Sequence, residues 1–166
     1  MQDELDLGVP GPADIVDAID LLQSHHDEIR QLFEDYESLL DENAPAADRQ
    51  NLAAEICTAL NLHAALEQEL LYPAAREALD SPRVLDAALV EHAVARGLVA
   101  EIESLEASDE LFDARVTVLG EYVLHHIEEE EEELLPQLYD TPLDLTELGR
   151  QMANRREELS DMRFAG

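Results

Sequence analysis

The chain lacks lysine and tryptophan, and its 166 residues include only one cysteine and 6 glycines. Cys57 alone cannot form an internal disulfide, and its apolar neighbours at helical spacing indicate a buried thiol. Aromatic residues make up only 4% of the chain, while Ala, Leu and Glu dominate, which is typical of helical proteins. Because 46% of the residues are hydrophobic, we expect one compact all-α domain.

Positive charge is also scarce, since the chain has 10 arginines but 40 acidic residues, and its formal net charge is −30. A surface this negative repels phosphate backbones and anionic lipids, so we expect no nucleic-acid partner and no membrane partner. For most of these carboxylates, adaptation to a salty cytoplasm or to a biased genome is a sufficient explanation.

Long apolar runs are missing as well. No stretch approaches the roughly 18 consecutive apolar residues of a membrane span. The first residues, Met-Gln-Asp-Glu-Leu-Asp-Leu-Gly, contain neither a basic segment nor an apolar run, so we expect no signal peptide. These absences favour a cytoplasmic protein.

The pattern of apolar and turn-forming residues predicts three parts. Glycines and prolines in residues 1–13 indicate an irregular N-terminal arm. Residues 14–140 carry apolar residues at steps of three and four in four segments with short connections, which predicts an antiparallel up-down-up-down four-helix bundle. Residues 141–166 predict a short extra C-terminal helix packed on the bundle, and their arginines indicate docking against acidic surface.

Two segments of the chain repeat one motif. His63 is followed by Glu67 and Pro73, and His126 is followed at the same intervals by Glu130 and Pro136. Residues four apart lie on the same face of an α-helix, so each copy directs an imidazole and a carboxylate to one place. Each proline is expected to kink its helix rather than end it, because helix-forming residues follow.

Two further histidines complete the pattern. His26 and His92 lie in the apolar seams of the first and third predicted helices, so each helix brings one histidine to the bundle interior. Buried imidazoles and carboxylates need partners, and a metal pair satisfies all six groups. Without a thiolate, this ligand set favours iron or manganese over structural zinc. We predict His26 and His63 on one ion, His92 and His126 on the other, and bridging carboxylates from Glu67 and Glu130.

These segments resemble the motifs of the hemerythrin-like HHE cation-binding proteins, in order, over about residues 14–139. The resemblance implies a non-haem di-iron centre, with an oxo or hydroxo bridge, in a four-helix bundle. It further implies that the centre meets dioxygen, or senses or detoxifies oxygen, peroxide or nitric oxide. The matching segments are Leu-Leu-Gln-Ser-His-His26-Asp-Glu-Ile-Arg, His63-Ala-Ala-Leu-Glu67-Gln-Glu-Leu-Leu-Tyr-Pro73, Glu-His92-Ala-Val-Ala-Arg and Gly-Glu-Tyr-Val-Leu-His-His126-Ile-Glu-Glu-Glu130.

The sequence departs from the classical oxygen carriers of that family at two positions. Arg96 stands where those carriers have a second histidine on the third helix. On the fourth helix the expected ligand is Glu130, four residues after His126, whereas the carriers have an Asp at five and Glu131 stands there. The departures disfavour reversible oxygen carriage and favour peroxide turnover, oxygen sensing or iron handling. Two alternatives stay open: an iron-binding or sensing module that acts through an unknown protein partner, and a structural bundle with a zinc or empty site.

Several neighbouring residues have two interpretations. His25 and His125 lie about 100° round the helix from a seam histidine, so each is either a flanking residue or a fifth imidazole ligand. Arg30 and Arg96 either orient the carboxylates or extend to the acidic surface. Tyr122 either reaches the site or is an ordinary buried tyrosine. Apart from Glu130, the run 128–133 is expected to be mostly solvated, with Glu132, like Glu69 in the first copy, facing away.

Overall fold

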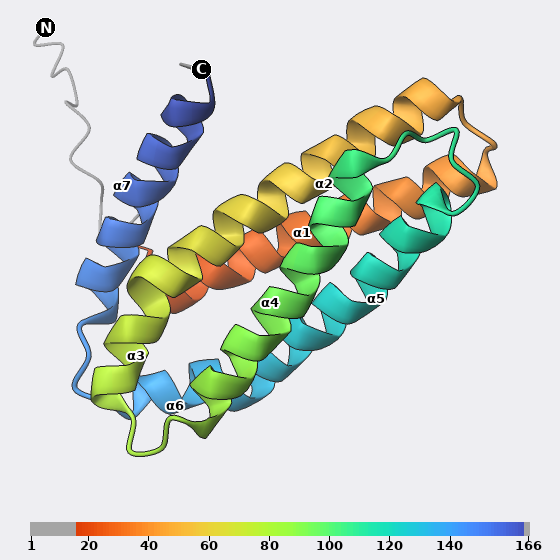
Figure 1. Ribbon diagram of the computed structural model, residues 1–166. Coiled ribbons are helices and arrows are strands. Elements are labelled where there is room, and N and C mark those ends of the chain that lie inside the picture. Colours follow the sequence, from red (N-terminus) through yellow and green to blue (C-terminus); the bar gives the residue numbers. More distant parts are fainter. Residues whose placement is uncertain (1–15, 165–166) are drawn as a thin grey trace, which may run out of the picture.

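The structure is a computed structural model that describes residues 16–164, and every regular element in that range is a helix (Figure 1). The N-terminal arm expected for residues 1–13 lies outside the described residues. The bundle is made of α1, the continuous segment α2–η2–α3, α4, and the continuous segment α5–η3–α6. Their bounds are Ala18–Asp41 for α1, Ala46–Leu66, Glu67–Leu71 and Tyr72–Ala78 for α2, η2 and α3, Arg83–Ser104 for α4, and Phe112–Glu129, Glu130–Leu134 and Leu135–Tyr139 for α5, η3 and α6.

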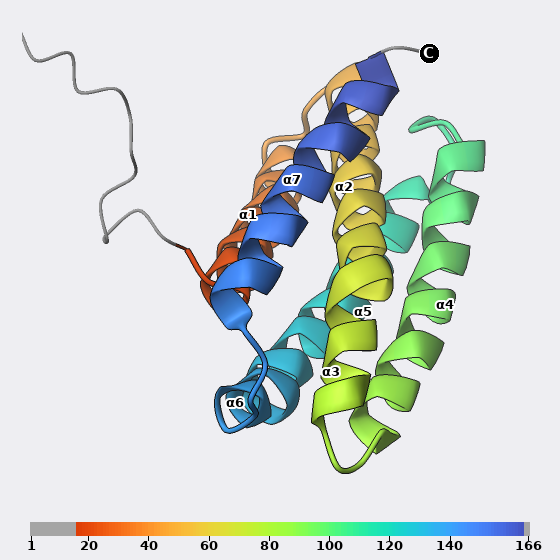
Figure 2. The same cartoon turned by 90° about the vertical axis from the view of Figure 1, so that its left-hand side faces the viewer.

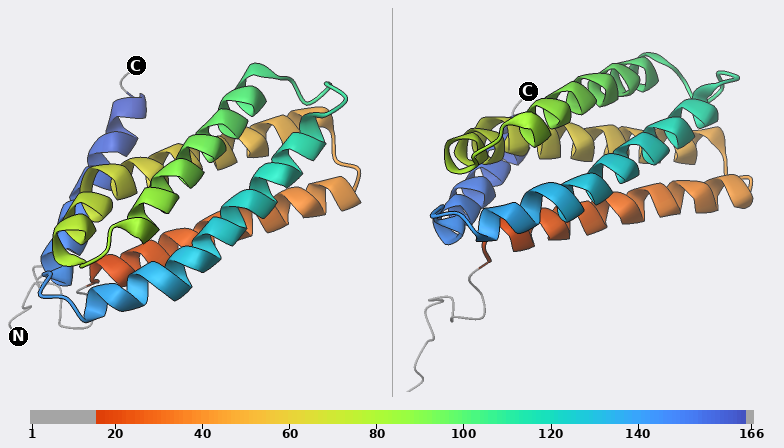
Figure 3. Two further views of the ribbon diagram at one scale, coloured as in Figure 1. Left: turned by 60° about the horizontal axis from the view of Figure 1, so that its bottom comes forward. Right: turned by 90° about the horizontal axis from the view of Figure 1, so that it is seen from below.

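Consecutive bundle segments run in opposite directions, as the two side views of the bundle show (Figure 3). Asp17 caps α1 by accepting a hydrogen bond from the Asp20 amide at 2.9 Å. Asn43, with φ of 52°, makes the turn into α2, a conformation that asparagine tolerates better than most residues. The prediction of an antiparallel four-helix bundle with an added C-terminal helix is confirmed.

The helices continue past both prolines, and the irregularity takes the form of a π turn. Pro73 and Pro136 have no amide proton, so the carbonyl four residues earlier loses its helical hydrogen bond. In each copy the chain widens by one residue per turn, and the amides of Tyr72 and Leu135 donate to the carbonyls of Glu67 and Glu130. Each π turn begins at the glutamate of its motif, and π turns of this kind are frequent at functional sites.

A polar layer separates two apolar clusters inside the bundle. Along α1, Leu22 belongs to one cluster and Ile29 to the other, and His26 lies between them. Along α2, Leu60 and Leu66 flank His63 in the same way. The apolar residues above and below therefore hold the polar side chains in a layer from which water is largely excluded.

The last helix, α7 (Leu145–Phe164), lies against α1, α2 and η2 on the outside of the bundle (Figure 2). Arg156 donates to Glu28 at 2.9 Å, and Arg155 donates to Glu69 at 2.8 Å. Two of its arginines thus dock on bundle carboxylates, as expected from the sequence.

No helix in residues 16–164 is both long and apolar enough to cross a membrane. Cys57 is buried, with 3% of its surface exposed, and its thiol is free, in agreement with the prediction of an apolar environment.

Candidate metal centre

The six residues predicted as ligands lie together in the polar layer. Potential ligand atoms of His26, His63, Glu67 and Glu130 all lie within 4.8 Å of one another. Ligand atoms of Glu67, His92 and His126 form a second group of three, which also lie within 4.8 Å of one another. Because Glu67 belongs to both groups, the two groups adjoin, and they divide the histidines into the two predicted pairs.

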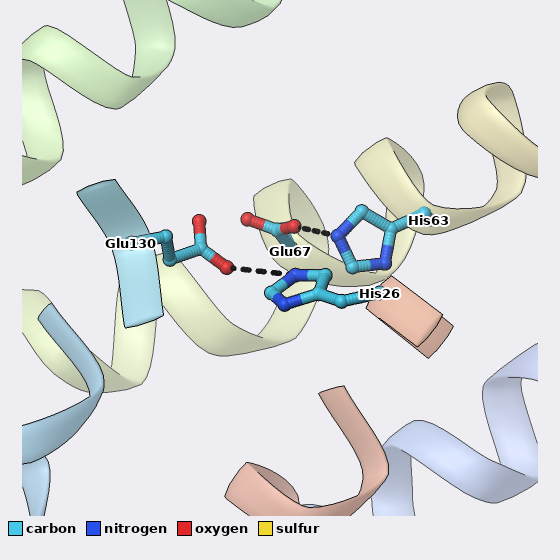
Figure 4. Close-up of side chains that lie close together, drawn as sticks. All are labelled: His26, His63, Glu67 and Glu130. Carbon is cyan, nitrogen blue, oxygen red and sulfur yellow. Dashed lines mark ion pairs between the residues drawn. The ribbon is translucent and has the colours of Figure 1, made fainter. Parts of the chain in front are cut away.

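The paired histidines come from neighbouring helices. The rings of His26 and His63 are 4.9 Å apart, centroid to centroid, with their planes at 67°. The rings of His92 and His126 are 5.0 Å apart at 71°. In Figure 4, His26 from α1 and His63 from α2 point toward the carboxylates of Glu67 and Glu130.

Each glutamate extends one oxygen toward each histidine pair. Oε1 of Glu130 is 3.4 Å from His26 Nε2, and its Oε2 is 3.4 Å from His126 Nε2. Oε1 of Glu67 contacts His63 Nε2, and its Oε2 is 3.6 Å from His92 Nε2. A carboxylate that spans two donor groups in this way has the geometry of a bridge between two ions.

The buried nitrogen and oxygen atoms of this layer are better placed to bind a metal ion than to form hydrogen bonds with one another. Five of these atoms lie close together, and none of the five has a hydrogen-bond partner in the described part of the chain. Unpartnered buried polar atoms are costly, and a cation supplies the missing interaction to nitrogen and oxygen lone pairs alike. The five are His26 Nε2, His63 Nε2, Glu67 Oε1, His126 Nε2 and Glu130 Oε1.

The electrostatics of the layer also favour cations. Burial opposes ionisation of Glu67, but the charge and contacts of His63 hold the pKa of this carboxyl well below its usual range. Burial lowers the pKa of His126, yet the adjacent Glu130 carboxylate raises it to about 9. His26 likewise has a raised pKa, because Glu130 outweighs the effect of burial. The carboxylates therefore favour the protonated form of His26 and His126. A metal ion would take the place of these protons.

Tyr72 is a seventh polar group at the centre that the sequence interpretation missed. Its hydroxyl donates to Glu130 Oε2 at 2.8 Å, contacts Glu67 Oε2, and lies 3.1 Å from His92 Nε2. Burial and the two carboxylates raise the pKa of Tyr72, so the phenol keeps its proton. The one available signal was the difference between the copies, where Tyr72 precedes Pro73 but Leu135 precedes Pro136.

Outer partners hold three of the four histidines. His26 Nδ1 is 2.9 Å from Glu131 Oε1, His92 Nδ1 is 3.0 Å from the Gln68 amide nitrogen, and His126 Nδ1 contacts Glu91. Glu131, which was expected to be solvated, has a side chain only 23% exposed. That expectation was wrong, because Glu131 turns inward to the histidine.

Arg30 and Arg96 contact these partners rather than the carboxylates of Glu67 and Glu130. Arg30 donates to Glu131 Oε2 at 2.7 Å, and Arg96 donates to Gln68 Oε1 at 3.1 Å. Hydrogen bonds to the outer nitrogen of a metal-binding histidine orient its ring and set its basicity.

Neither extra histidine enters the two groups of candidate ligands. His25 is buried beside His63, with 6.1 Å between ring centroids, but Arg156 donates to its Nε2 at 2.7 Å. Burial and Arg156 lower the pKa of His25 to about 3. The side chain of His125 is 71% exposed and pairs with Glu129. Tyr122 is half-buried and makes no hydrogen bond to a site group in the described residues.

Two cavities that touch site residues lie beside α4. One, of about 50 Å³, lies among α2, α4 and α5 and touches three of the site histidines, and its other walls are largely apolar, with Leu60, Val99 and Val123 among them. The second, of about 60 Å³, lies between α4 and the α5–η3 segment beside His126 and Glu130. A small neutral molecule therefore has space next to the histidines.

The fold and this layer define a helical-bundle protein of the cation-binding class, with histidine and glutamate donors in its core. The sequence profile of the Hemerythrin HHE cation binding domain matches residues 17–138, and the chain belongs to that family. The structure is similar to the crystal structure of a hemerythrin HHE cation-binding domain-containing protein from Mycobacterium kansasii. The two chains are 25% identical, each is covered over 86% of its length, and the TM-score is 0.71. A comparison with curated proteins gives no match.

Proposed function

We propose that this chain is a cytoplasmic non-haem di-iron protein that binds or reacts with dioxygen or a related small oxidant, such as peroxide or nitric oxide. The observation that carries the proposal is the placement of Glu67 and Glu130, each with one oxygen toward each histidine pair. One carboxylate beside one histidine pair would fit a single ion. Two carboxylates that span both pairs fit two ions.

The chain's residues have distinct roles in this proposal. The four histidines and two glutamates would hold the ions, which when bound supply one-electron redox chemistry. Glu131 and Glu91 fix the rings of His26 and His126 from behind. The Tyr72 hydroxyl holds a proton between the two bridging carboxylates, and its oxygen lies beside both of them.

The surroundings support a small apolar reactant. The cavity of about 50 Å³ is too small for a metabolite, and its largely apolar lining favours a neutral diatomic over an ion. Arg96, which stands where the classical carriers have a further histidine, lines that cavity and binds Gln68. A centre with one imidazole fewer leaves more room for exchangeable ligands, which supports oxidant turnover, including decomposition of peroxide, over reversible carriage.

Anaerobic loading of the metal-free chain with ferrous iron tests this function. We expect about two irons per chain, as in other carboxylate-bridged bundles, and new visible charge-transfer absorption after oxygen or peroxide is added. Manganese and zinc are loaded in parallel as controls that bind without this response. One tightly held zinc ion, with no visible bands after iron loading and oxidation, would refute the proposal and favour a structural site.

A second candidate, a sensing module that acts through a partner, has one observation in its favour. Arg156 of α7 bonds to His25, and His25 lies edge-on to His63, so the outer helix is two contacts away from the centre. If the chain senses metal or oxidant, hydrogen exchange of α7 amides will change when iron is bound or oxidised. Equal exchange in all states would rule out signalling through α7.

A further inference from the structure

The repeat in the sequence extends to the residues behind the ligands. Arg30 follows His26 by four residues, and Arg96 follows His92 by four. Gln68 comes directly after the bridging glutamate of the first copy, and Glu131 comes directly after that of the second. The structure joins these residues into two matching relays, Arg30–Glu131–His26 and Arg96–Gln68–His92. Their middle members differ in one chemical group, a carboxylate in one relay and an amide in the other.

The carboxylate relay prepares His26 to bind a metal. Ionised Glu131 can only accept hydrogen bonds, so its contact at 2.9 Å places the ring proton of His26 on Nδ1. Nε2 then carries a free lone pair and faces Glu130 in the centre. This is the arrangement that metal-binding histidines normally have, with an outer carboxylate that increases ligand basicity.

The amide relay imposes the opposite arrangement on His92. The Arg96 guanidinium donates to Gln68 Oε1 at 3.1 Å, which turns the amide NH₂ toward His92 Nδ1 at 3.0 Å. A donor at Nδ1 makes that nitrogen an acceptor, so the ring proton is on Nε2, where an ion would bind. If the amide turned by 180°, its oxygen would accept a proton from Nδ1, and Nε2 would be free to bind an ion. The NH₂ of Gln68 would then face the Arg96 guanidinium, and two donors would meet.

The two relays also differ in charge. Arg30 is paired with Glu131 at 2.7 Å and with Asp27 at 2.9 Å. Arg96 contacts a neutral amide and has no ion pair within residues 16–162. The charge of Arg96 therefore stays unpaired, whereas that of Arg30 is neutralised, and the Arg96 charge opposes a cation beside His92.

The hydrogen bonds of the other site histidines do not remove this difference between the two pairs. His126 is backed by the Glu91 carboxylate, so each pair contains one carboxylate-backed ring. The other ring of the first pair, His63, has no hydrogen-bond partner at Nδ1 among the described residues, and nothing there dictates its proton position. Only His92 receives a hydrogen bond at Nδ1 from a group that cannot accept one in its observed orientation.

We propose that Gln68, held by Arg96, is a positioning residue that makes the His92–His126 position the weaker and later-filled of the two metal positions. The proposal rests on the proposed two-ion function and deepens it, because it assigns an order of loading. The first ion would occupy the His26–His63 position. The second would bind only after the amide turns and the ring proton of His92 moves from Nε2 to Nδ1, which makes that position the exchangeable one.

Anaerobic titration of the metal-free protein with Co²⁺ tests the order, by calorimetry in the presence of a competing chelator. The wild-type chain is expected to bind two ions in two resolved steps. Gln68→Glu should tighten the weaker step by about tenfold, since outer-shell partners of metal ligands change affinity by that order. Glu131→Gln, the mirror-image change, should weaken the tighter step by a similar factor.

Arg96→Ala distinguishes a role of the Arg96–Gln68 relay from the effect of the carboxylate that Gln68→Glu introduces. Arg96 is exposed, so its removal leaves the core intact, and it frees Gln68 to present its oxygen to His92 Nδ1. We expect this variant also to tighten the weaker step, whereas loss of a merely supporting arginine would loosen it. Helical circular dichroism and the melting temperature of each metal-free variant check that it folds.

The outcomes separate this inference from the function on which it rests. If the wild-type chain binds fewer than two ions under every condition, the two-ion function itself fails. If it binds two ions and Gln68→Glu leaves the weaker step unchanged or loosens it, the function stands and the role of Gln68 is refuted. If Gln68→Glu tightens that step but Arg96→Ala does not, added charge explains the effect and the relay is refuted.

Discussion

The hydroxyl of Tyr72 donates a hydrogen bond to Oε2 of Glu130 at 2.8 Å, and so ties the first copy of the repeated motif to the second. The same hydroxyl contacts Glu67, five residues before Tyr72. On a regular α-helix, residues five apart lie about 140° apart round the axis. The π turn at Glu67–Leu71 reduces that angle, and the Tyr72 hydroxyl reaches the Glu67 carboxylate.

Replacing Tyr72 with phenylalanine should destabilise the metal-free protein. The change removes the donor shared by two buried carboxylates and leaves them facing each other, which costs about 1–3 kcal/mol for an unmet buried polar group. Urea unfolding of the chelator-treated protein measures the free energy. Tyr139→Phe is the control, since Tyr139 is 58% exposed, and it should have no effect. Equal stability of Tyr72→Phe and the wild type would show that the hydroxyl contributes nothing to the layer.

The proposed bridging role of Glu67 and Glu130 predicts a sharp contrast within one acidic run. Glu67→Ala and Glu130→Ala each remove a carboxylate that reaches both histidine pairs, so each should lower iron below the roughly two ions per chain expected of such bundles. Iron per folded chain, measured after anaerobic loading and desalting, is the readout.

Glu132→Ala is the matched control for these variants. Glu132 lies two residues from Glu130 in the same run, but its side chain is exposed. It should retain the wild-type iron content. If it lost iron to the same extent as Glu130→Ala, the ligand assignment on this helix would be wrong.

The regular spacing of residues on a helix explains which parts of the centre could be predicted from the sequence. The seam positions of His26 and His92 and the spacing from His63 to Glu67 determine direction directly, so the polar layer follows from pattern alone. Tyr72 could not be placed, because the π turn before it changes the direction in which its side chain points. The spacing of residues in the sequence does not reveal such a turn. Gln68 and Glu91 were missed for another reason. Their partners are on other helices, and such contacts depend on side-chain conformation and packing rather than on spacing.

Gly120 tests how closely α1 and α5 pack beside the centre. A Cβ built on this buried glycine would lie 2.8 Å from Cδ1 of Phe33. Gly120→Ala gains about 1 kcal/mol of helix propensity but overpacks a site where such insertions cost about 1–3 kcal/mol. We expect a net loss of stability in thermal unfolding.

Gly97 in α4 provides the opposite case. A Cβ there meets nothing within 4 Å, and the residue is exposed. Gly97→Ala should therefore stabilise the protein by up to about 1 kcal/mol through helix propensity alone. If Gly120→Ala stabilised the protein as much as Gly97→Ala, the close contact between α1 and α5 would not exist in solution.

Cys57 should take no part in the chemistry of the proposed oxidant-handling centre. Burial, assisted by the charge of Glu103, raises the pKa of its thiol from 9.0 to about 11. The thiolate is the reactive form, so at pH 8 its fraction is about a hundredfold smaller than for an ordinary cysteine, and it grows about tenfold per pH unit up to 11. Iodoacetamide alkylation, followed by mass spectrometry, should be slow in the folded chain and fast in urea. Rapid alkylation of the folded protein at pH 8, or oxidation of Cys57 by peroxide before the metal centre responds, would contradict this assignment.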